Sequence, residues 1–324
     1  MQNRTFDEWI EDFKDYRISC ELSTTCLELI KTFRNWCRRN YPEEMYLQQE
    51  MIDRWGTKRV TENISTQNSR ASNINQLIEH INLRGGNFNY IEYESGGRHT
   101  VEARVIGEKE FRNVLRAADE LSVSPNVKSK YYIRELVLAL EMPVVVRLLY
   151  SSGIRPPEAR LLERSSVDLE NGILYVRKGK GYKERIVALD PGMNELLHKY
   201  DGKMDAIFPN RGPFFPNENG NFRSRSSYGE AWRKMYDKYN DKPAEGEKPM
   251  VIYCLRHTYT TRNIERLPQD GYQKDIKVLA LSRSLGHENV SFTIDTYYHL
   301  TPRSSEIFDE KMGDTFDQII PDID

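Results

Sequence analysis

The amino-acid sequence predicts a mainly helical protein with a small antiparallel β-sheet, organised as two domains. Its 324 residues are enough for two domains of ordinary size. Apolar residues recur every three or four positions over most of the chain, a spacing typical of helices that bury one face. Two short alternating runs follow in residues 173–189 and are typical of a β-hairpin. We therefore expect a helical first domain at residues 1–95, a linker at 96–107, and a mixed α+β second domain at 108–324.

The first domain contains four helical segments. Thr5 and Glu8 form a T-x-x-E capping box before the first segment, and Thr25 and Glu28 form a second box before the next. The fourth segment ends at two glycines, residues 85–86, where a left-handed cap is expected. The apolar positions that define the four segments are Phe6, Trp9, Ile10, Phe13, Leu29, Ile30, Phe33, Trp36, Cys37, Met51, Ile52, Trp55, Ile74, Leu77, Ile78 and Ile81.

The second domain begins where helical spacing resumes. The pattern is broken over residues 92–107, returns at Phe111, and continues in a long apolar segment at 133–150. The alternating runs 173–177 and 185–189 then predict two strands that flank a loop.

Charge is distributed unevenly along the chain. Lys and Arg total 47 against 49 Asp and Glu, so the formal charge is −2, which excludes a wholly basic DNA coat but not a local basic site. Residues 302–324 carry −5, and the rest of the chain carries about +3. Residues 177–185 hold five bases and one acid around two glycines, a composition that suits contact with a phosphate backbone or, equally, a solvated hairpin tip.

The sequence shows no pattern typical of a disulfide-bonded, metal-binding, secreted or membrane protein. The four cysteines show neither a C-x-x-C pair nor disulfide-like spacing, which favours a reducing compartment and no metal site. No apolar run approaches 18 residues, and the first residues do not form a signal peptide, so we expect a cytoplasmic protein without a membrane segment.

Five motifs in order resemble the tyrosine recombinases, also called the phage integrase family, in their short two-domain form. The resemblance covers residue 108 to about residue 302. The motifs are Leu148-Leu149-Tyr150-Ser151-Ser152-Gly153-Ile154-Arg155 with Glu158, then Gly179-Lys180-Gly181-Tyr182-Lys183-Glu184-Arg185, Leu255-Arg256-His257, Leu285-Gly286-His287, and Tyr297-Tyr298-His299. The first domain resembles the core-binding domain of this family, which clamps DNA, in length and helical character.

The resemblance implies a site that cleaves DNA without metal or cofactor. Arg155 and Arg256 would clamp the scissile phosphate, because a guanidinium keeps its charge and matches phosphate oxygens. Lys180 would protonate the leaving 5′-oxygen, and His287 would donate to a non-bridging oxygen. The supporting and DNA-binding residues would be Glu158, which holds an arginine, His257, which orients its neighbours, and the loop bases Arg177, Lys178, Lys183 and Arg185.

The nucleophile implied by the resemblance is Tyr297. The family usually ends its last box with Tyr-x-His, which selects Tyr297 because His299 follows two residues later. Tyr297 also lies ten residues after His287, against a usual interval of about nine, whereas Tyr298 lies eleven after it. Tyr298 is then an aromatic packing residue.

Two features depart from the family pattern. Tyr253 occupies the position, three residues before Arg256, where the family commonly has histidine. A tyrosine hydroxyl donates a hydrogen bond but is a poor base at neutral pH, so the identity of the general base stays open. The interval from Arg256 to His287 is also long, and residues 267–271 are the expected extra loop.

The resemblance implies site-specific recombination of double-stranded DNA through a 3′-phosphotyrosine, with a homotetramer on DNA and a monomer or weak dimer alone. Integration or excision of a mobile element is favoured, and an accessory DNA-bending or directionality factor is a further expected partner. The alternatives are a Xer-like chromosome or plasmid resolvase, a type IB topoisomerase, and a DNA-binding protein without cleavage. Apolar residues among the acids of 302–324 would let this tail dock on a neighbouring subunit or pack on its own.

Overall fold

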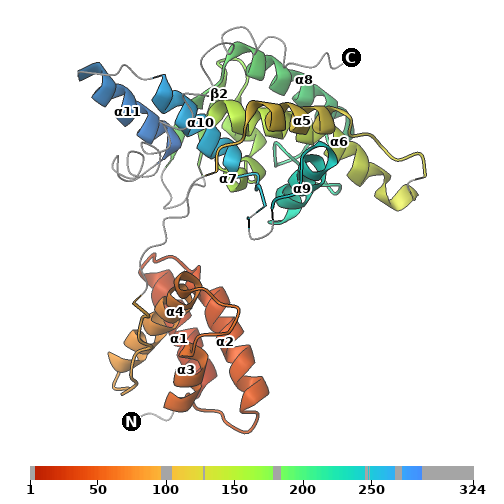
Figure 1. Cartoon of the computed structure of the whole chain (residues 1–324). Helices are drawn as coiled ribbons and strands as arrows, with labels where there is room; N and C mark the ends of the chain where they lie inside the picture. The colour runs from red at the N-terminus through yellow and green to blue at the C-terminus, as the bar shows by residue number, and fades with distance from the viewer. Residues whose placement is uncertain are drawn as a thin grey trace. The chain divides into compact units, whose positions relative to one another are not determined.

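The computed structural model of the chain describes residues 4–95, 104–126, 128–177, 184–244, 247, 249–266 and 272–286. The chain divides into two compact units, Met1–Val101 and Glu102–Asp324. The described residues are mostly helical and contain one small antiparallel sheet (Figure 1), which confirms the predicted fold class.

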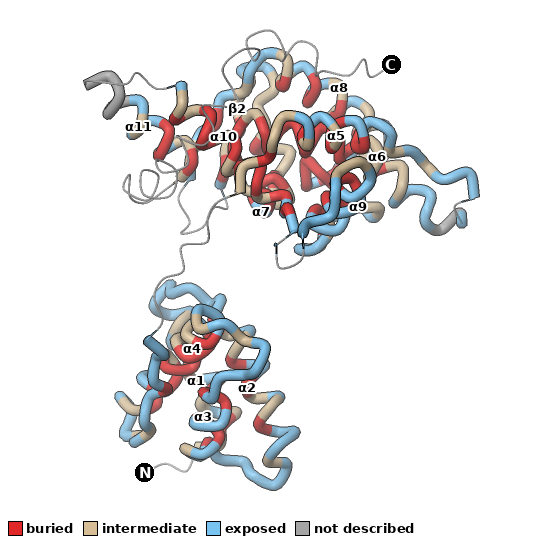
Figure 2. Tube along the Cα trace, in the orientation of Figure 1, coloured by how far each residue is buried: buried red, intermediate tan, exposed pale blue. Residues whose placement is uncertain are grey.

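The first unit consists of the helices α1 (Phe6–Ser19), α2 (Cys26–Asn40), α3 (Gln49–Gly56) and α4 (Ile64–Asn82). Their apolar faces meet in one core, and α4 contributes a continuous buried face (Figure 2). The fully buried residues at the centre of this core are Phe13, Ile30, Phe33, Met51, Ile52, Ile74, Leu77 and Ile78. These belong to the apolar stripes that the sequence predicts.

One of the two predicted capping boxes forms. The Glu8 N–H donates to Thr5 Oγ1 at 3.3 Å, and the Thr5 N–H donates to Glu8 Oε2 at 2.7 Å. The second predicted box is wrong, because Thr25 has helical backbone angles and makes no side-chain cap. Its hydroxyl instead lies 3.0 Å from that of Ser23. Gly85, two residues after the α4 cap residue, has the predicted left-handed conformation with a φ of 93°.

The helices of the second unit surround α6 (Ser129–Ser152). Within this unit α5 (Glu108–Asp119), α8 (Pro191–Ile207) and α10 (Cys254–Glu265) pack against α6 (Figure 1). The other helices are α7 (Pro156–Arg160), the 3₁₀ helix η1 (Arg164–Ser166), α9 (Ser227–Tyr239), which packs on α5, and α11 (Tyr272–Leu285). Residues 142–150 of α6 are buried throughout, as expected for its long apolar segment.

The sheet consists of β1 (Val167–Asp168), β2 (Ile173–Val176) and β3 (Arg185–Ala188), in that order and antiparallel. Val176 pairs with Arg185, so the predicted hairpin is confirmed and its described part ends at this pair. Leu174 and Val187 point into the core, whereas Ile186 is exposed. The hairpin loop, residues 178–183, lies outside the described residues, as does the expected loop at 267–271.

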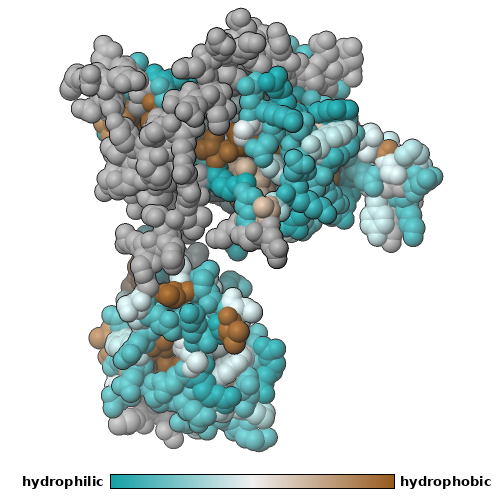
Figure 3. Space-filling view, viewed as in Figure 1, coloured by the Kyte–Doolittle hydropathy of each residue, from teal (hydrophilic) through white to brown (hydrophobic). Residues whose placement is uncertain are grey.

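The described surface of both units is mostly hydrophilic on the face shown in Figure 3, with hydrophobic residues in small separate patches. None of the described helices is long and apolar enough to cross a membrane.

Candidate active site

Arg155 is the N-cap residue of α7 and is held by Glu158 one turn later. The backbone N–H of Arg155 donates to Glu158 Oε2 at 2.7 Å, and its Nη1 donates to Oε1 at 2.8 Å. Burial alone would lower the pKa of Arg155, but the hydrogen bond and charge of Glu158 raise it above its ordinary value, with a smaller contribution from Tyr253. The side chain is 16% exposed, so a permanently charged guanidinium lies near the surface with a fixed orientation.

Glu158 bridges Arg155 and Arg185. Arg185 Nη1 donates to Glu158 Oε1 at 3.0 Å, and Nη2 donates to Oε2 at 2.6 Å, a bidentate pair. Burial would raise the pKa of Glu158, but hydrogen bonds and charge from Arg185 and then Arg155 lower it below its ordinary value. Glu158 therefore holds two arginines, whereas the sequence predicts that it holds one.

The sequence predicts that Arg185 contacts DNA, but the structure directs its guanidinium into the protein. Its Nε donates to the Ser284 carbonyl at 2.7 Å, while both Nη atoms bind Glu158. Its side chain is 8% exposed. The Arg185 guanidinium, for which the sequence predicts a phosphate contact, is thus occupied by internal contacts in this structure.

Arg256 lies in the first turn of α10 and is almost completely buried. Its Nη1 donates to the Gly153 carbonyl at 2.8 Å, and its Nη2 donates to the Leu285 carbonyl at 2.8 Å. Gly153 ends α6 in a left-handed conformation with a φ of 64°, and a Cβ there would overlap the ring of Tyr259. Gly153 thus permits the close approach that places its carbonyl before Arg256.

Three arginines converge on the carboxyl end of α11. The consecutive carbonyls of Ser284, Leu285 and Gly286 accept from Arg185, Arg256 and Arg155, the last at 3.5 Å. The last carbonyls of a helix lack partners within the helix and carry partial negative charge, so guanidiniums stabilise them. The structure therefore brings Arg155 and Arg256 to one helix end, directly before His287 in the sequence.

Tyr253 and His257 form an aromatic pair beside these arginines, with ring centroids 5.1 Å apart. Burial and the charge of Arg256 lower the pKa of His257 to about 4. This imidazole is neutral at neutral pH but a weak base, which favours packing against Tyr253 over proton abstraction.

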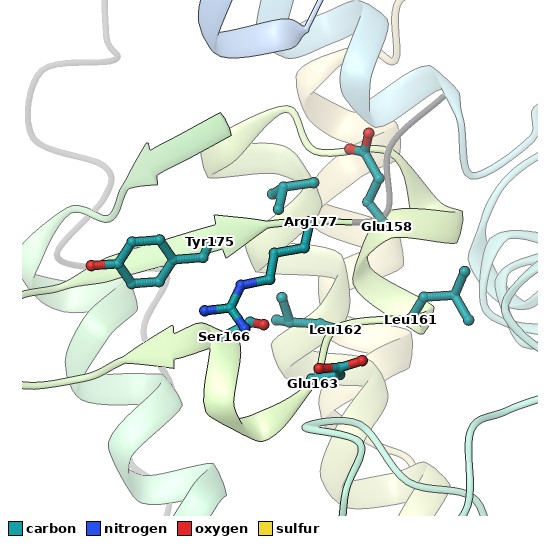
Figure 4. Close-up of a pocket in the computed structure, with 8 residues that line it drawn as sticks. Glu158, Leu161, Leu162, Glu163, Ser166, Tyr175 and Arg177 are labelled. Carbon is teal, nitrogen blue, oxygen red and sulfur yellow. The ribbon is translucent and has the colours of Figure 1, made fainter. Parts of the chain in front are cut away.

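Arg177 follows the end of β2 and is exposed, with its guanidinium 5.8 Å from the centroid of the Tyr175 ring. Together with Glu158 it lines a cavity of about 60 Å³ (Figure 4). The remaining lining residues are Leu161, Leu162, Glu163, Ser166, Tyr175 and Val176. Arg177, unlike Arg185, is thus accessible where the basic loop begins.

The other predicted site residues lie outside the described residues. They are Lys178, Lys180, Lys183, His287, Tyr297, Tyr298 and His299. Sequence reasoning missed the two glycine carbonyls that hold the arginines, those of Gly153 and Gly286. The available signal was the glycine in each of these site motifs, because glycine is typical of the left-handed residue that ends a helix.

We predict that Glu158→Gln destabilises the second unit by about 3 kcal/mol at neutral pH, because it leaves two largely buried guanidiniums without a counter-charge. Since folding lowers the pKa of Glu158, its charged form stabilises the protein fully above the ordinary value of 4.5. This stabilisation is lost as the pH falls through the lower folded-state value. The free energies of unfolding of the variant and of wild type, measured in urea, should therefore become equal in acid. If variant and wild type differed in unfolding free energy by the same amount at pH 7 and in acid, the ion pairs of Glu158 with the two arginines would not be the cause. Glu230→Gln, at an exposed position, is the control.

Comparisons with known proteins identify the family of the chain. The sequence model described as the phage integrase family matches residues 105–304. A protein named as an integrase/recombinase, y4rE of Sinorhizobium fredii, is 30% identical over 202 residues, 61% of this chain and 59% of that protein. Tyrosine recombinase XerC of Chlorobaculum parvum is 33% identical over 221 residues, 64% of this chain and 60% of that protein. The chain thus matches about three fifths of the length of each relative.

A solved structure shares the fold. A lambda integrase tetramer bound to a Holliday junction matches 91% of this chain and 78% of its own, with a TM-score of 0.59 and 13% sequence identity. The family model covers more than half of the chain, including the described arginine site and the segments that carry Lys180, His287 and Tyr297. The chain therefore belongs to the phage integrase family.

Proposed function

We propose that the protein is a site-specific DNA recombinase that cuts and rejoins double-stranded DNA through a 3′-phosphotyrosine intermediate. The observation that carries the proposal is the pair Arg155 and Arg256, two permanent charges bound to the consecutive carbonyls of Gly286 and Leu285. Cleavage of a phosphodiester passes through a transition state that gathers negative charge on the phosphoryl oxygens. Preorganised guanidiniums stabilise that charge with little reorganisation.

In the proposed reaction Tyr297 gives its hydroxyl proton to water or to a neighbouring base, and the phenolate oxygen attacks the scissile phosphorus. The new bond joins phosphorus to the tyrosine oxygen, and the bond to the 5′-oxygen breaks. Lys180 gives a proton to that oxygen, so a free 5′-hydroxyl leaves. The 5′-hydroxyl of a partner strand then attacks the phosphotyrosine and releases the tyrosine. The number of phosphoester bonds is unchanged, so the reaction needs no nucleotide cofactor.

Exchange between two duplexes requires more than one active site. We propose a homotetramer on DNA, supported by the lambda integrase tetramer on a Holliday junction, and a monomer or weak dimer without DNA. The first unit would bind the duplex as a DNA clamp, and Arg177 with the loop lysines would contact phosphates. The reaction would take place in the cytoplasm. Integration or excision of a mobile element is the proposed role, and docking of the acidic tail on a neighbouring subunit would couple activity to assembly.

A plasmid assay tests recombination against its alternatives. Binding sites are first selected from a random duplex pool, and two copies are placed on a supercoiled plasmid. We expect excision or inversion of the intervening segment without ATP or divalent metal. Relaxation without exchange would favour a type IB topoisomerase, and binding without either product would favour a DNA-binding protein. Both results would contradict the proposal. Exchange only between directly repeated sites, as excision, would point to a Xer-like resolvase.

A further inference from the structure

We propose that Arg185 is a positioning residue for the phosphate clamp: it holds Arg155 in place through Glu158 and ties both to the end of α11. The inference rests on the proposed strand-cleavage function and assigns Arg185 a role inside the protein.

Every guanidinium nitrogen of Arg185 donates a hydrogen bond inside the protein. Nε binds the Ser284 carbonyl at 2.7 Å, while Nη1 and Nη2 bind the two oxygens of Glu158 at 3.0 and 2.6 Å. The side chain is 8% exposed, and that of Glu158 is 2% exposed. A planar fork that satisfies a buried carboxylate in this way has little freedom to turn toward DNA.

The same carboxylate also holds Arg155. Glu158 Oε1 accepts from both Arg155 Nη1 and Arg185 Nη1, and Oε2 accepts from the Arg155 backbone and Arg185 Nη2. Arg185 therefore limits the positions that Glu158 can adopt, and Glu158 in turn limits those of Arg155. Loss of Arg185 would leave the Glu158 side chain free to rotate around a single partner.

Arg185 and Arg155 also share an anchor at the end of α11. Arg185 binds the Ser284 carbonyl, and Arg155 approaches the Gly286 carbonyl two residues later. A Cβ at Gly286 would lie 3.2 Å from Arg185 Nη1, so the backbone there is packed against this guanidinium. Arg185 thus joins strand β3, helix α7 and the end of α11, the segments that fix the position of Arg155.

The test compares two cleavage substrates that differ only in charge at the scissile phosphate. Both are nicked duplexes carrying the selected site, one with the natural phosphate and one with a single methylphosphonate, in which a methyl group replaces a non-bridging oxygen. The methylphosphonate lacks the negative charge that the clamp stabilises. A defect that acts through Arg155 should therefore be large on the phosphate and small on the methylphosphonate.

We expect Arg185→Gln to slow cleavage of the phosphate about 100-fold, the size of effect that misplacement of a reacting group by about 1 Å produces. DNA affinity should change little, and the rate on the methylphosphonate should stay near that of wild type. Arg155→Ala should show the same pattern in stronger form. Arg185→Lys retains charge but not the fork and should give an intermediate rate. The exposed Arg233→Gln on α9 controls for the loss of one positive charge.

Three outcomes would overturn the inference. Equal slowing on both substrates, together with a lower unfolding temperature, would mean that Arg185 serves stability alone. Weaker DNA binding with a shallower salt dependence would mean that Arg185 contacts a phosphate directly. If wild type cleaves neither substrate, the proposed function itself fails, and the inference fails with it.

Discussion

Gly153→Ala is expected to destabilise the second unit by about 3 kcal/mol and to impair the active site at the same time. The stability loss has two parts. An alanine at a φ of 64° costs about 1–2 kcal/mol, because its Cβ crowds the carbonyl in the left-handed region. That Cβ would also overlap the Tyr259 ring, and overpacking of this kind costs about 1–3 kcal/mol. Backbone movement that relieves the overlap would shift the carbonyl that accepts from Arg256, so DNA cleavage should fall further than stability alone explains.

A matched substitution separates these parts. Gly172 has nearly the same backbone conformation, with a φ of 65°, but its nearest neighbour to a new Cβ is an Asn194 side-chain atom at 3.7 Å. Gly172→Ala should therefore show the conformational cost alone and leave cleavage unchanged. Hydrogen exchange of amides in α6 and α10 measures the opening free energy of the unit. Equal effects of the two substitutions would contradict the close packing of Tyr259 on Gly153.

Much of the fold could be predicted from the sequence because it depends on local patterns. The spacing of apolar residues predicted α1, α2, α4 and α5, and alternation predicted the β2–β3 hairpin. Strand β1 has only two residues, too few for any alternation to be visible, and it forms only because β2 lies beside it. The Thr25 box does not form because Thr25 has helical backbone angles, whereas a capping residue is usually extended.

Part of the site could likewise be predicted from local motifs, and part could not. Arg155, Glu158 and Arg256 could be assigned from motifs, and the structure places all three around the end of α11. The inward orientation of Arg185 could not be predicted, because its partners are 27 and 99 residues away in the sequence. A basic loop has the same composition whether its last arginine binds DNA or a buried carboxylate. Only the three-dimensional contacts distinguish the two.

In the proposed reaction Tyr297 forms a covalent bond with DNA at the arginine clamp. A nicked duplex that carries the selected site tests this directly. The label is on the part of the cut strand that becomes linked to the tyrosine through its 3′-phosphate. The short fragment beyond the cleavage point diffuses away after cleavage, so the protein stays attached and migrates with the label in denaturing gels. We expect an adduct with wild type and none with Tyr297→Phe, which lacks the attacking oxygen but keeps the ring.

The neighbouring tyrosine supplies the control. Tyr298→Phe removes the same atom one residue later and should leave the adduct in place. Persistence of the adduct in Tyr297→Phe, or its loss in Tyr298→Phe alone, would contradict the account.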